Sequence, residues 1–480
     1  MKAFNLILAL FFTGLFPLVA GAAEPGFVPT PRVDERVELL GIVFRLAGIQ
    51  EYQCEAFKQY DDDIQEHFGK MKNHAAIRSA KMLRRMRGIG YNAIVDFGAH
   101  LTIRDGHVEI ADENSGLTLD GMDPRWTKEV AVAFAGILDD FYVKSRFREF
   151  YESHRELYDQ LEKRFTSISD KIDYGWFEKF YGVNNLENFR LILCLTSESN
   201  NYGGTCKYRD GHETYFAFIG ESGLELPVDE TSTIHLIVHE FSHSFCNPLV
   251  KKYRADLLPR AKKLFPFIRE AMELQNYTTP EIVWYEYLVR SCENRYLRTH
   301  NQTRFANQLL AYQKQCSFIW LDKLIEELAS YEKERDRFPT LDSFMPEIVK
   351  LQDAVISDEF LAELQRQEEA RPKVISTTPE RNAKNVDPAL TEISATFDRP
   401  MRTWSYAWCT MDGNKTFPKL VEPKVRWSDD KKTCFMGTVK LEPGKTYNIH
   451  LNSPGNMDFA SEEGTPLEPI LFSFTTKEKE

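Results

Sequence analysis

The stretch from Thr233 to Phe245 most constrains this chain, because it combines an apolar helical pattern with a His-Glu-x-x-His motif. His239 and His243 are four residues apart, so on a helix they share one face and are separated by one turn. Two imidazoles in that arrangement can bind one metal ion, and Glu240 then lies where it can take a proton from an activated water. The motif therefore predicts a zinc site with one position left open for water.

A zinc site of this kind needs a third protein ligand. The metzincin pattern, in which a Gly and a third His follow the motif, is excluded because Cys246 and Leu249 stand at those positions. We therefore expect a glutamate from a later helix, the gluzincin arrangement. Glu286 is the favoured ligand, because a carboxylate in an apolar, aromatic stretch needs a partner. Glu293 is the alternative ligand, and an ordinary ion pair with Arg290 is the competing interpretation for Glu286.

Attack of water on a carbonyl creates an oxyanion, which a neutral or cationic donor should stabilise. Tyr202, expected in a loop after the strand predicted over residues 189–196, is the favoured catalytic candidate. The alternatives are Tyr285, Tyr287 and Arg290. An edge strand before the motif helix could hold an extended peptide by strand addition, and residues 214–219 are the expected strand.

Length and composition limit the classes of protein that need to be considered. With 480 residues, 42% hydrophobic and 13% aromatic, the chain is expected to fold into two or three globular domains. A net charge of -12 argues against a nucleic-acid partner. The eight cysteines include no Cys-x-x-Cys pair, which argues against a cysteine zinc site. Cys409 and Cys434 could form a disulfide or remain as two buried thiols.

Residues 1–23 are typical of a secretory signal peptide. Lys2 provides the positive start, Phe4 to Val19 is nearly all apolar, and Ala20 to Ala23 offers small residues for cleavage. The apolar run is short for a membrane span and is broken by Pro17, so we expect cleavage and no integral membrane segment afterwards. The expected location is secreted or periplasmic, with cell-surface association open.

Hydrophobic periodicity predicts a helix-rich α+β domain over residues 30–350 and a helical linker over residues 351–372. Asp105-Gly106 marks a hairpin within residues 101–110. The motif helix is expected to stop at Asn247-Pro248. The other expected helices cover residues 33–46, 70–87, 126–181, 251–275, 280–297 and 303–332, and the other strands cover residues 91–97, 189–196 and 214–220.

The pattern changes from Lys373 onward, where short alternating runs are separated by turn-forming residues. Residues 373–480 are therefore expected to form a small all-β Ig-like sandwich. The clearest of these runs are residues 392–397, 445–451 and 471–476.

Several segments together resemble a bacterial family whose function is undefined. They are Val37 to Leu40, Asn201 to Gly203, His239 to Pro248 and Tyr285 to Arg290. Members of that family are secreted and contain an HExxH core, and the resemblance implies a zincin-like zinc metallopeptidase domain. Residues 373–476 resemble a bacterial Ig-like domain, which implies a spacer or adhesion unit. The segments that carry this second resemblance are Thr378 to Asp387, Phe397 to Met401 and Leu441 to Tyr447.

The function predicted from these observations is an exported, zinc-dependent metallopeptidase with Glu240 as general base and a peptide or protein as substrate. Two other hypotheses stay open. One is a non-catalytic surface protein that binds peptide or glycan on a zincin-like scaffold. The other is a zinc amidase that acts on cell-wall material, which the motif does not distinguish because the water chemistry is the same.

Overall fold

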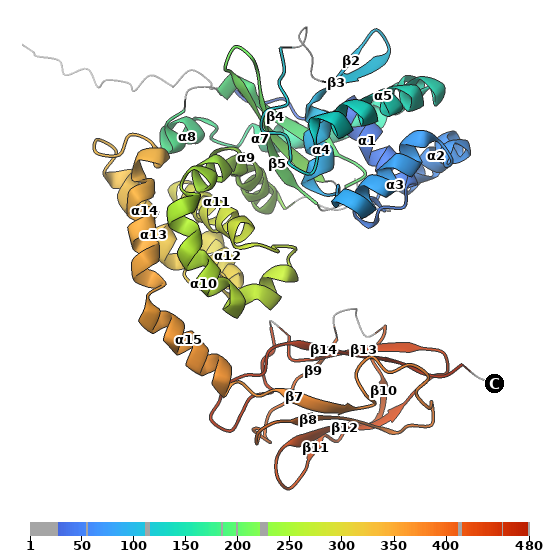
Figure 1. The fold of residues 1–480 in the computed structure, drawn as a ribbon, viewed down its shortest axis with the longest axis vertical. Coiled ribbons are helices and arrows are strands. Elements are labelled where there is room, and N and C mark those ends of the chain that lie inside the picture. Colours follow the sequence, from blue (N-terminus) through green and yellow to red (C-terminus); the bar gives the residue numbers. More distant parts are fainter. Residues whose placement is uncertain are drawn as a thin grey trace, which may run out of the picture.

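The computed structural model describes residues 27–53, 56–110, 116–183, 186–197, 200–220, 229–410, 415–453 and 455–478. These residues form a helix-rich N-terminal part and a β-sandwich, joined by helix α15 (Asp358–Ala370) (Figure 1). The signal peptide predicted over residues 1–23 lies outside the described residues. Among the described residues, no helix has both the length and the apolar character that a membrane crossing requires.

A four-stranded sheet lies at the centre of the N-terminal part. Its order is β1 (Arg32–Val33), β4 (Phe189–Cys194), β6 (Glu213–Gly220) and β5 (Tyr202–Lys207). The first three strands are parallel, and β5 runs antiparallel to β6. The strands predicted at 189–196 and 214–220 are confirmed. The expected edge position is wrong, because β6 is an interior strand and β5 is the edge.

Helices cover both faces of this sheet. Val37 of α1 and Val95 of α4 pack against one face, in a cluster with Ile192 and Phe218. Phe241 of α9 packs against the other face, with its ring centroid 4.7 Å from that of Phe189. The first helices are α1 (Glu35–Leu46), α2 (Lys58–Phe68), α3 (Ala75–Arg87), α4 (Asn92–Ala99), α5 (Lys128–Lys144), α6 (Phe147–Ser153), α7 (Arg155–Ser169) and α8 (Gly175–Phe177).

The remaining helices of this part form a bundle that carries the motif. They are α9 (Glu230–Lys252), α10 (Arg254–Glu273), α11 (Pro280–Thr299), α12 (Thr303–Gln315), α13 (Leu321–Lys333) and α14 (Leu341–Val355). The helix predicted over 303–332 is therefore two helices. The linker expected over 351–372 is helical, and α15 makes up most of it.

One local prediction in this region is wrong and one is confirmed. The strand expected over residues 91–97 is instead the start of helix α4, with Tyr91 as the N-cap residue. A Cβ at Gly98 of α4 would lie 3.1 Å from Leu40 and 3.3 Å from Val37, so this glycine permits close packing of α4 on α1. The hairpin is confirmed as β2 (Leu101–Arg104) and β3 (His107–Ile110), with Asp105 and Gly106 both at positive φ, as its tight turn requires.

The motif helix α9 does not stop at Pro248 but continues to Lys252. Proline removes one backbone donor from a helix, which usually costs stability. Burial of Phe245, Cys246 and Val250 on either side of the proline offsets that cost and holds this end of the helix in the core.

The C-terminal part is a β-sandwich, as predicted. One sheet contains β7 (Val374–Thr378), β8 (Glu392–Phe397), β10 (Lys419–Glu422), β11 (Arg426–Trp427) and β12 (Thr433–Lys440). The other contains β9 (Trp408–Cys409), β13 (Thr446–Leu451) and β14 (Ile470–Thr475). Ile393, Met436 and Phe472 from both sheets share one buried cluster. Cys409 and Cys434 are free thiols on different sheets.

Candidate metal centre

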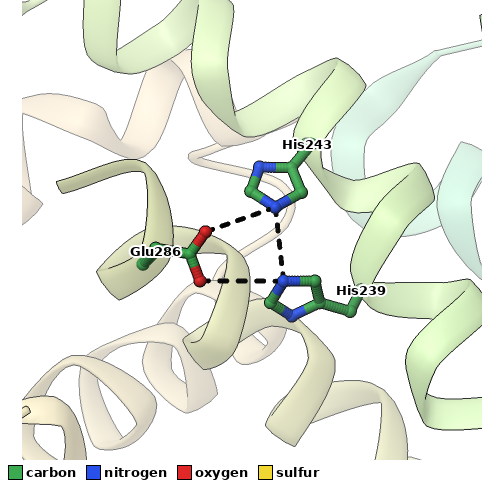
Figure 2. Close-up of side chains that lie close together, drawn as sticks. All are labelled: His239, His243 and Glu286. Atoms are coloured by element: carbon green, nitrogen blue, oxygen red, sulfur yellow. Dashed lines mark hydrogen bonds and ion pairs between the residues drawn. The ribbon is translucent and has the colours of Figure 1, made fainter. Parts of the chain in front are cut away.

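Helices α9 and α11 bring three potential metal ligands together. His239 and His243 lie on one face of α9, and Glu286 faces them from α11 (Figure 2). The Nε2 atoms of the two histidines are 3.2 Å apart. The Glu286 carboxylate oxygens lie 3.7 Å from Nε2 of His239 and 3.5 Å from Nε2 of His243.

These distances fit one tetrahedral metal ion. Ligand atoms at zinc–nitrogen and zinc–oxygen distances lie about 3.3 Å from one another around a tetrahedral centre. The three observed separations are close to that value, and all the ligand atoms lie within 4.8 Å of one another. Three ligands leave a fourth position for water or substrate. The group His239, His243 and Glu286 can therefore hold a metal ion.

Neighbouring side chains fix the orientation of both imidazoles. His239 Nδ1 lies 2.5 Å from Oε2 of Glu293, and the other oxygen of that carboxylate accepts from Gln313 at 2.8 Å. His243 Nδ1 lies 3.1 Å from Oδ1 of Asn247. With Nδ1 engaged on each ring, both Nε2 atoms are directed toward the metal position, as in well-formed metal sites. Both carboxylate oxygens of Glu293 have hydrogen-bond partners, one in His239 and the other in Gln313. Glu293 therefore supports His239 and is not the third ligand.

Glu286 also has a fixed orientation. Its Oε2 forms an ion pair with Arg290, at 3.0 Å from Nη2 and 3.1 Å from Nε. Arg290 in turn donates to the Tyr277 hydroxyl at 2.9 Å and lies over the ring of Phe318. The ion pair considered as an alternative to metal binding therefore exists, and it leaves Oε1 of Glu286 directed at His243.

The electrostatics of the site follow from burial and from these pairs. Burial alone would lower the pKa of His239 and raise that of Glu293, but their ion pair reverses both directions. Burial lowers the pKa of His243 to about 4, so its imidazole is neutral, as a metal ligand must be. Burial alone would raise the pKa of Glu286, but the attraction of Arg290 and the two histidines outweighs burial, so the pKa is lowered.

Glu240 follows the first histidine on α9 and is buried. Burial raises the pKa of Glu240 to about 8, and the charges of Glu286 and Glu293 act in the same direction. A carboxyl group with a pKa near neutrality can both accept and release a proton, which is what a general acid or base requires.

The edge strand β5 runs close against α9 at the metal ligands. A Cβ at Gly203 would lie 2.2 Å from the backbone oxygen of Glu240 and 2.6 Å from Cβ of His243. Only glycine permits this approach. The Ser244 hydroxyl donates to the backbone oxygen of Gly204 at 2.9 Å and fixes the strand in place. The edge strand and the ligand helix thus form one rigid unit.

The structure does not bring Tyr202 to the metal ligands. The residue lies on β5 and not in a loop. Because side chains alternate along a strand, Tyr202 is on the opposite face from Gly203, and it packs against the cluster on that face with Phe216 and Phe218. Burial first, and then Glu51, raises the pKa of Tyr202. A part for Tyr202 in oxyanion stabilisation stays a prediction.

Of the other expected donors, Tyr285 and Arg290 already have carboxylate partners, whereas the buried hydroxyl of Tyr287 has no hydrogen-bond partner among the described residues. The Tyr285 hydroxyl donates to Glu281 at 2.8 Å, and the Tyr287 ring stacks on Trp320. The supporting residues Asn247, Gln313 and Tyr277 were not identified from the sequence. Asn247 could have been found, because it lies four residues after His243 on the same helix face. Gln313 and Tyr277 come from other elements, and no local pattern marks them.

The comparisons with known proteins agree with the division of the chain into a helix-rich N-terminal part and a C-terminal β-sandwich. A family described as a domain of unknown function (DUF4932) matches residues 30–351, and a bacterial Ig-like domain matches residues 368–476. The first match spans more than half of the chain, so the chain belongs to the DUF4932 family. No curated protein matches the chain.

Two solved structures show limited similarity. PcoC, a methionine-rich copper resistance protein from Escherichia coli, is 24% identical over 22% of this chain and 100% of its own, with a TM-score of 0.17. The S-layer protein rSbsC is 18% identical over 51% of this chain and 34% of its own, with a TM-score of 0.16. TM-scores this low carry no argument about fold or function.

Proposed function

We propose that this chain is an exported, zinc-dependent peptidase. The observation that carries the proposal is the convergence of His239, His243 and Glu286 beside the buried carboxyl of Glu240. Two imidazoles and one carboxylate, with an open fourth position, are a donor set typical of the zinc sites of hydrolytic enzymes. When bound there, zinc supplies Lewis-acid chemistry, acidifying water and polarising a carbonyl.

The residues of the chain have separate tasks in this proposal. Glu240 accepts the proton of the attacking water and delivers it to the leaving amine. Glu293 and Asn247 hold the two imidazoles, and Arg290 holds Glu286. These supports keep the ligands in place before substrate arrives, so little reorganisation is needed during the reaction.

The edge of β5 is the proposed substrate platform. An extended peptide can add to an exposed edge through backbone hydrogen bonds. Leu117 and Thr118 pair with the strand only at its far end, near Lys207 and Tyr208. The end near Gly203 adjoins the ligand helix, so a peptide bound along it would pass the metal position.

Export is supported by two features of the chain. The N-terminal residues have the pattern of a cleaved signal peptide. The C-terminal domain belongs to a class typical of bacterial surface proteins. We therefore propose a secreted or periplasmic enzyme.

Metal analysis and a single substitution test the proposal. Wild-type protein should hold one zinc per chain and cleave members of a peptide library. Glu240→Gln should retain zinc and lose cleavage by at least about 100-fold, because it removes the general base. Glu230→Gln, at the exposed start of the same helix, is the matched control and should leave both properties unchanged.

Each other outcome points to a different function. Protein that neither contains nor takes up a metal would contradict the enzyme proposal. Zinc with no peptide cleavage, but with release of fragments from cell-wall material, would identify an amidase. Zinc with no hydrolysis of either substrate would favour a non-catalytic binding protein.

A further inference from the structure

Residues 70–87 are unusually basic for this chain. They contain seven Lys and Arg residues and no Asp or Glu, whereas the whole chain has a net charge of -12. Most of the segment forms helix α3, whose inner face packs in the core through Ile77, Ala80 and Leu83. Figure 1 shows α3 on the side of the N-terminal part that is turned toward the β-sandwich, with a gap between the two ribbons. Lys81, Met82, Arg85 and Met86 on its outer face are exposed.

Several of these cations lack a partner within the described residues. Three of them do have partners, since Arg84 forms an ion pair with Glu51, and Arg78 and Arg87 donate to the backbone oxygens of Asn73 and Arg125. By contrast, Lys70, Lys72, Lys81 and Arg85 are exposed and form no ion pair or hydrogen bond with side chains that the structure describes. Lys81 and Arg85 are four residues apart on α3 and therefore share one face, where their positive potential favours an anionic partner.

Two methionines lie on the same face of the helix. Met82 and Met86 are one turn apart and are 54% and 68% exposed. An exposed pair of flexible apolar side chains is unfavourable in water. A soluble polyanion would neutralise the cations but would leave these methionines in water. A lipid bilayer would neutralise the cations at its headgroups and also bury the methionines.

We infer that the outer face of α3 docks this chain on the surface of an anionic phospholipid membrane. Lys81 and Arg85 contact the headgroups, and Met82 and Met86 enter the boundary between headgroups and acyl chains. The acidic residues of the preceding helix α2 do not cancel this charge. Asp61 and Asp62 form ion pairs with Arg45 and Lys58, and Asp63 contacts His154, which leaves Glu66 as the one acidic residue of α2 with no ion pair among the described residues. The inference is independent of the proposed peptidase activity.

Vesicle co-sedimentation of the full chain tests the inference. The protein should bind vesicles of phosphatidylglycerol and phosphatidylcholine, should not bind phosphatidylcholine alone, and should release as salt rises. Each cation near an anionic surface strengthens partitioning roughly fivefold, so Lys81→Glu with Arg85→Glu should weaken it by roughly 25-fold or more. Met82→Ser with Met86→Ser keeps the charge and should weaken binding by roughly tenfold.

A matched control separates local from general charge effects. Lys419 and Lys440 are exposed and face each other on β10 and β12 of the sandwich. Lys419→Glu with Lys440→Glu changes the net charge by the same amount as the α3 variant and should leave vesicle binding intact. Lys70→Glu with Lys72→Glu provides a second charge variant if the first one misfolds, as judged by circular dichroism.

Three outcomes would overturn the inference. The first is failure of the wild-type chain to bind anionic vesicles. The second is equal loss of binding in the sandwich control. The third is binding that is insensitive to the methionine changes and is competed fully by soluble polyphosphate, which would identify a polyanion as the partner and not a membrane.

Discussion

Glu286 and Glu293 show how two identical residues on one helix acquire different tasks. They are seven residues apart and share a face of α11, but Glu286 meets both Nε2 atoms and Glu293 meets only Nδ1 of His239. The difference arises because Glu286 lies on the Nε2 side of both imidazoles, whereas Glu293 lies on the Nδ1 side of His239. Ligand and support should therefore respond differently to substitution.

We expect Glu286→Ala to abolish stoichiometric metal binding, because it removes a ligand. Glu293→Gln should retain the site but weaken metal affinity by roughly 10- to 100-fold, as loss of a supporting carboxylate does. Equilibrium titration with a zinc chelator measures both affinities. If Glu293→Gln lost the metal as completely as Glu286→Ala, the assignment of the third ligand would be wrong.

Glu38 of α1 is a buried carboxyl with no cation beside it. Its oxygens accept from the Tyr60 hydroxyl at 2.9 Å and from the backbone of Leu195 at 3.0 Å. Burial raises the pKa of Glu38 to about 7. In the unfolded chain the pKa of this carboxyl is near its ordinary value of 4.5. The folded protein is therefore most stable below pH 4.5, and it loses stability as pH rises through 7, because the buried carboxyl must then ionise.

Glu38→Gln should therefore remove the loss of folding stability that ionisation of Glu38 causes at high pH. Gln keeps an acceptor for Leu195 and can donate to Tyr60, but it cannot ionise. At pH 8 the variant should be more stable than wild type by about 3 kcal/mol, and at pH 5 the two should differ little. Calorimetry at both pH values measures this. Glu66→Gln, an exposed change on α2, is the control, and a variant less stable than wild type at pH 8 would refute the reasoning.

At the scale of elements, the contact between β5 and α9 joins the proposed substrate platform to the helix that carries two of the candidate metal ligands. Gly203→Val would force the strand away from the backbone of Glu240 and from His243, since a Cβ already overlaps both. We expect loss of about 1 to 3 kcal/mol of stability together with weaker metal binding. Gly136→Ala on α5 is the control, because a Cβ there meets open space and should be neutral or stabilising. Normal metal affinity in Gly203→Val would show that the contact does not support the site.

At the scale of the whole molecule, the two parts have separate hydrophobic cores. The clusters of the N-terminal part and those of the sandwich share no residue among those that the structure describes. The parts are joined by α15 and by polar contacts such as Arg399 with the backbone oxygens of Glu369 and Ala370. Small polar interfaces of this kind add little stability.

We therefore expect residues 27–371 to fold alone and to bind the same number of zinc ions as the full chain. Calorimetry of the full chain should resolve two transitions, and one should coincide with that of the isolated fragment. A fragment that aggregates or fails to bind zinc, while the full chain binds it, would show that the sandwich completes the N-terminal fold.

Local patterns were enough to predict the sandwich, the hairpin at Asp105-Gly106 and the motif helix, because alternation, turn residues and helical spacing are properties of short segments. Predictions from local patterns failed where packing between elements determines the secondary structure. The segment 92–99 forms helix α4 because Gly98 lets it pack on α1. Tyr202 to Lys207 form a strand despite two glycines because β6 pairs with them. The helix continues past Pro248 because its end is buried.

The sequence by itself determined His239, Glu240 and His243, since their spacing places them on one helix turn regardless of the rest of the fold. It limited the third ligand to Glu286 or Glu293 but could not choose between them. Only the tertiary structure made that choice, because the crossing of α9 and α11 sets which carboxylate reaches Nε2 and which reaches Nδ1. It also brought Gln313 of α12 to Glu293, a contact between helices that no spacing within one segment specifies. Asn247 and Arg290, by contrast, support His243 and Glu286 from four residues along the same helix.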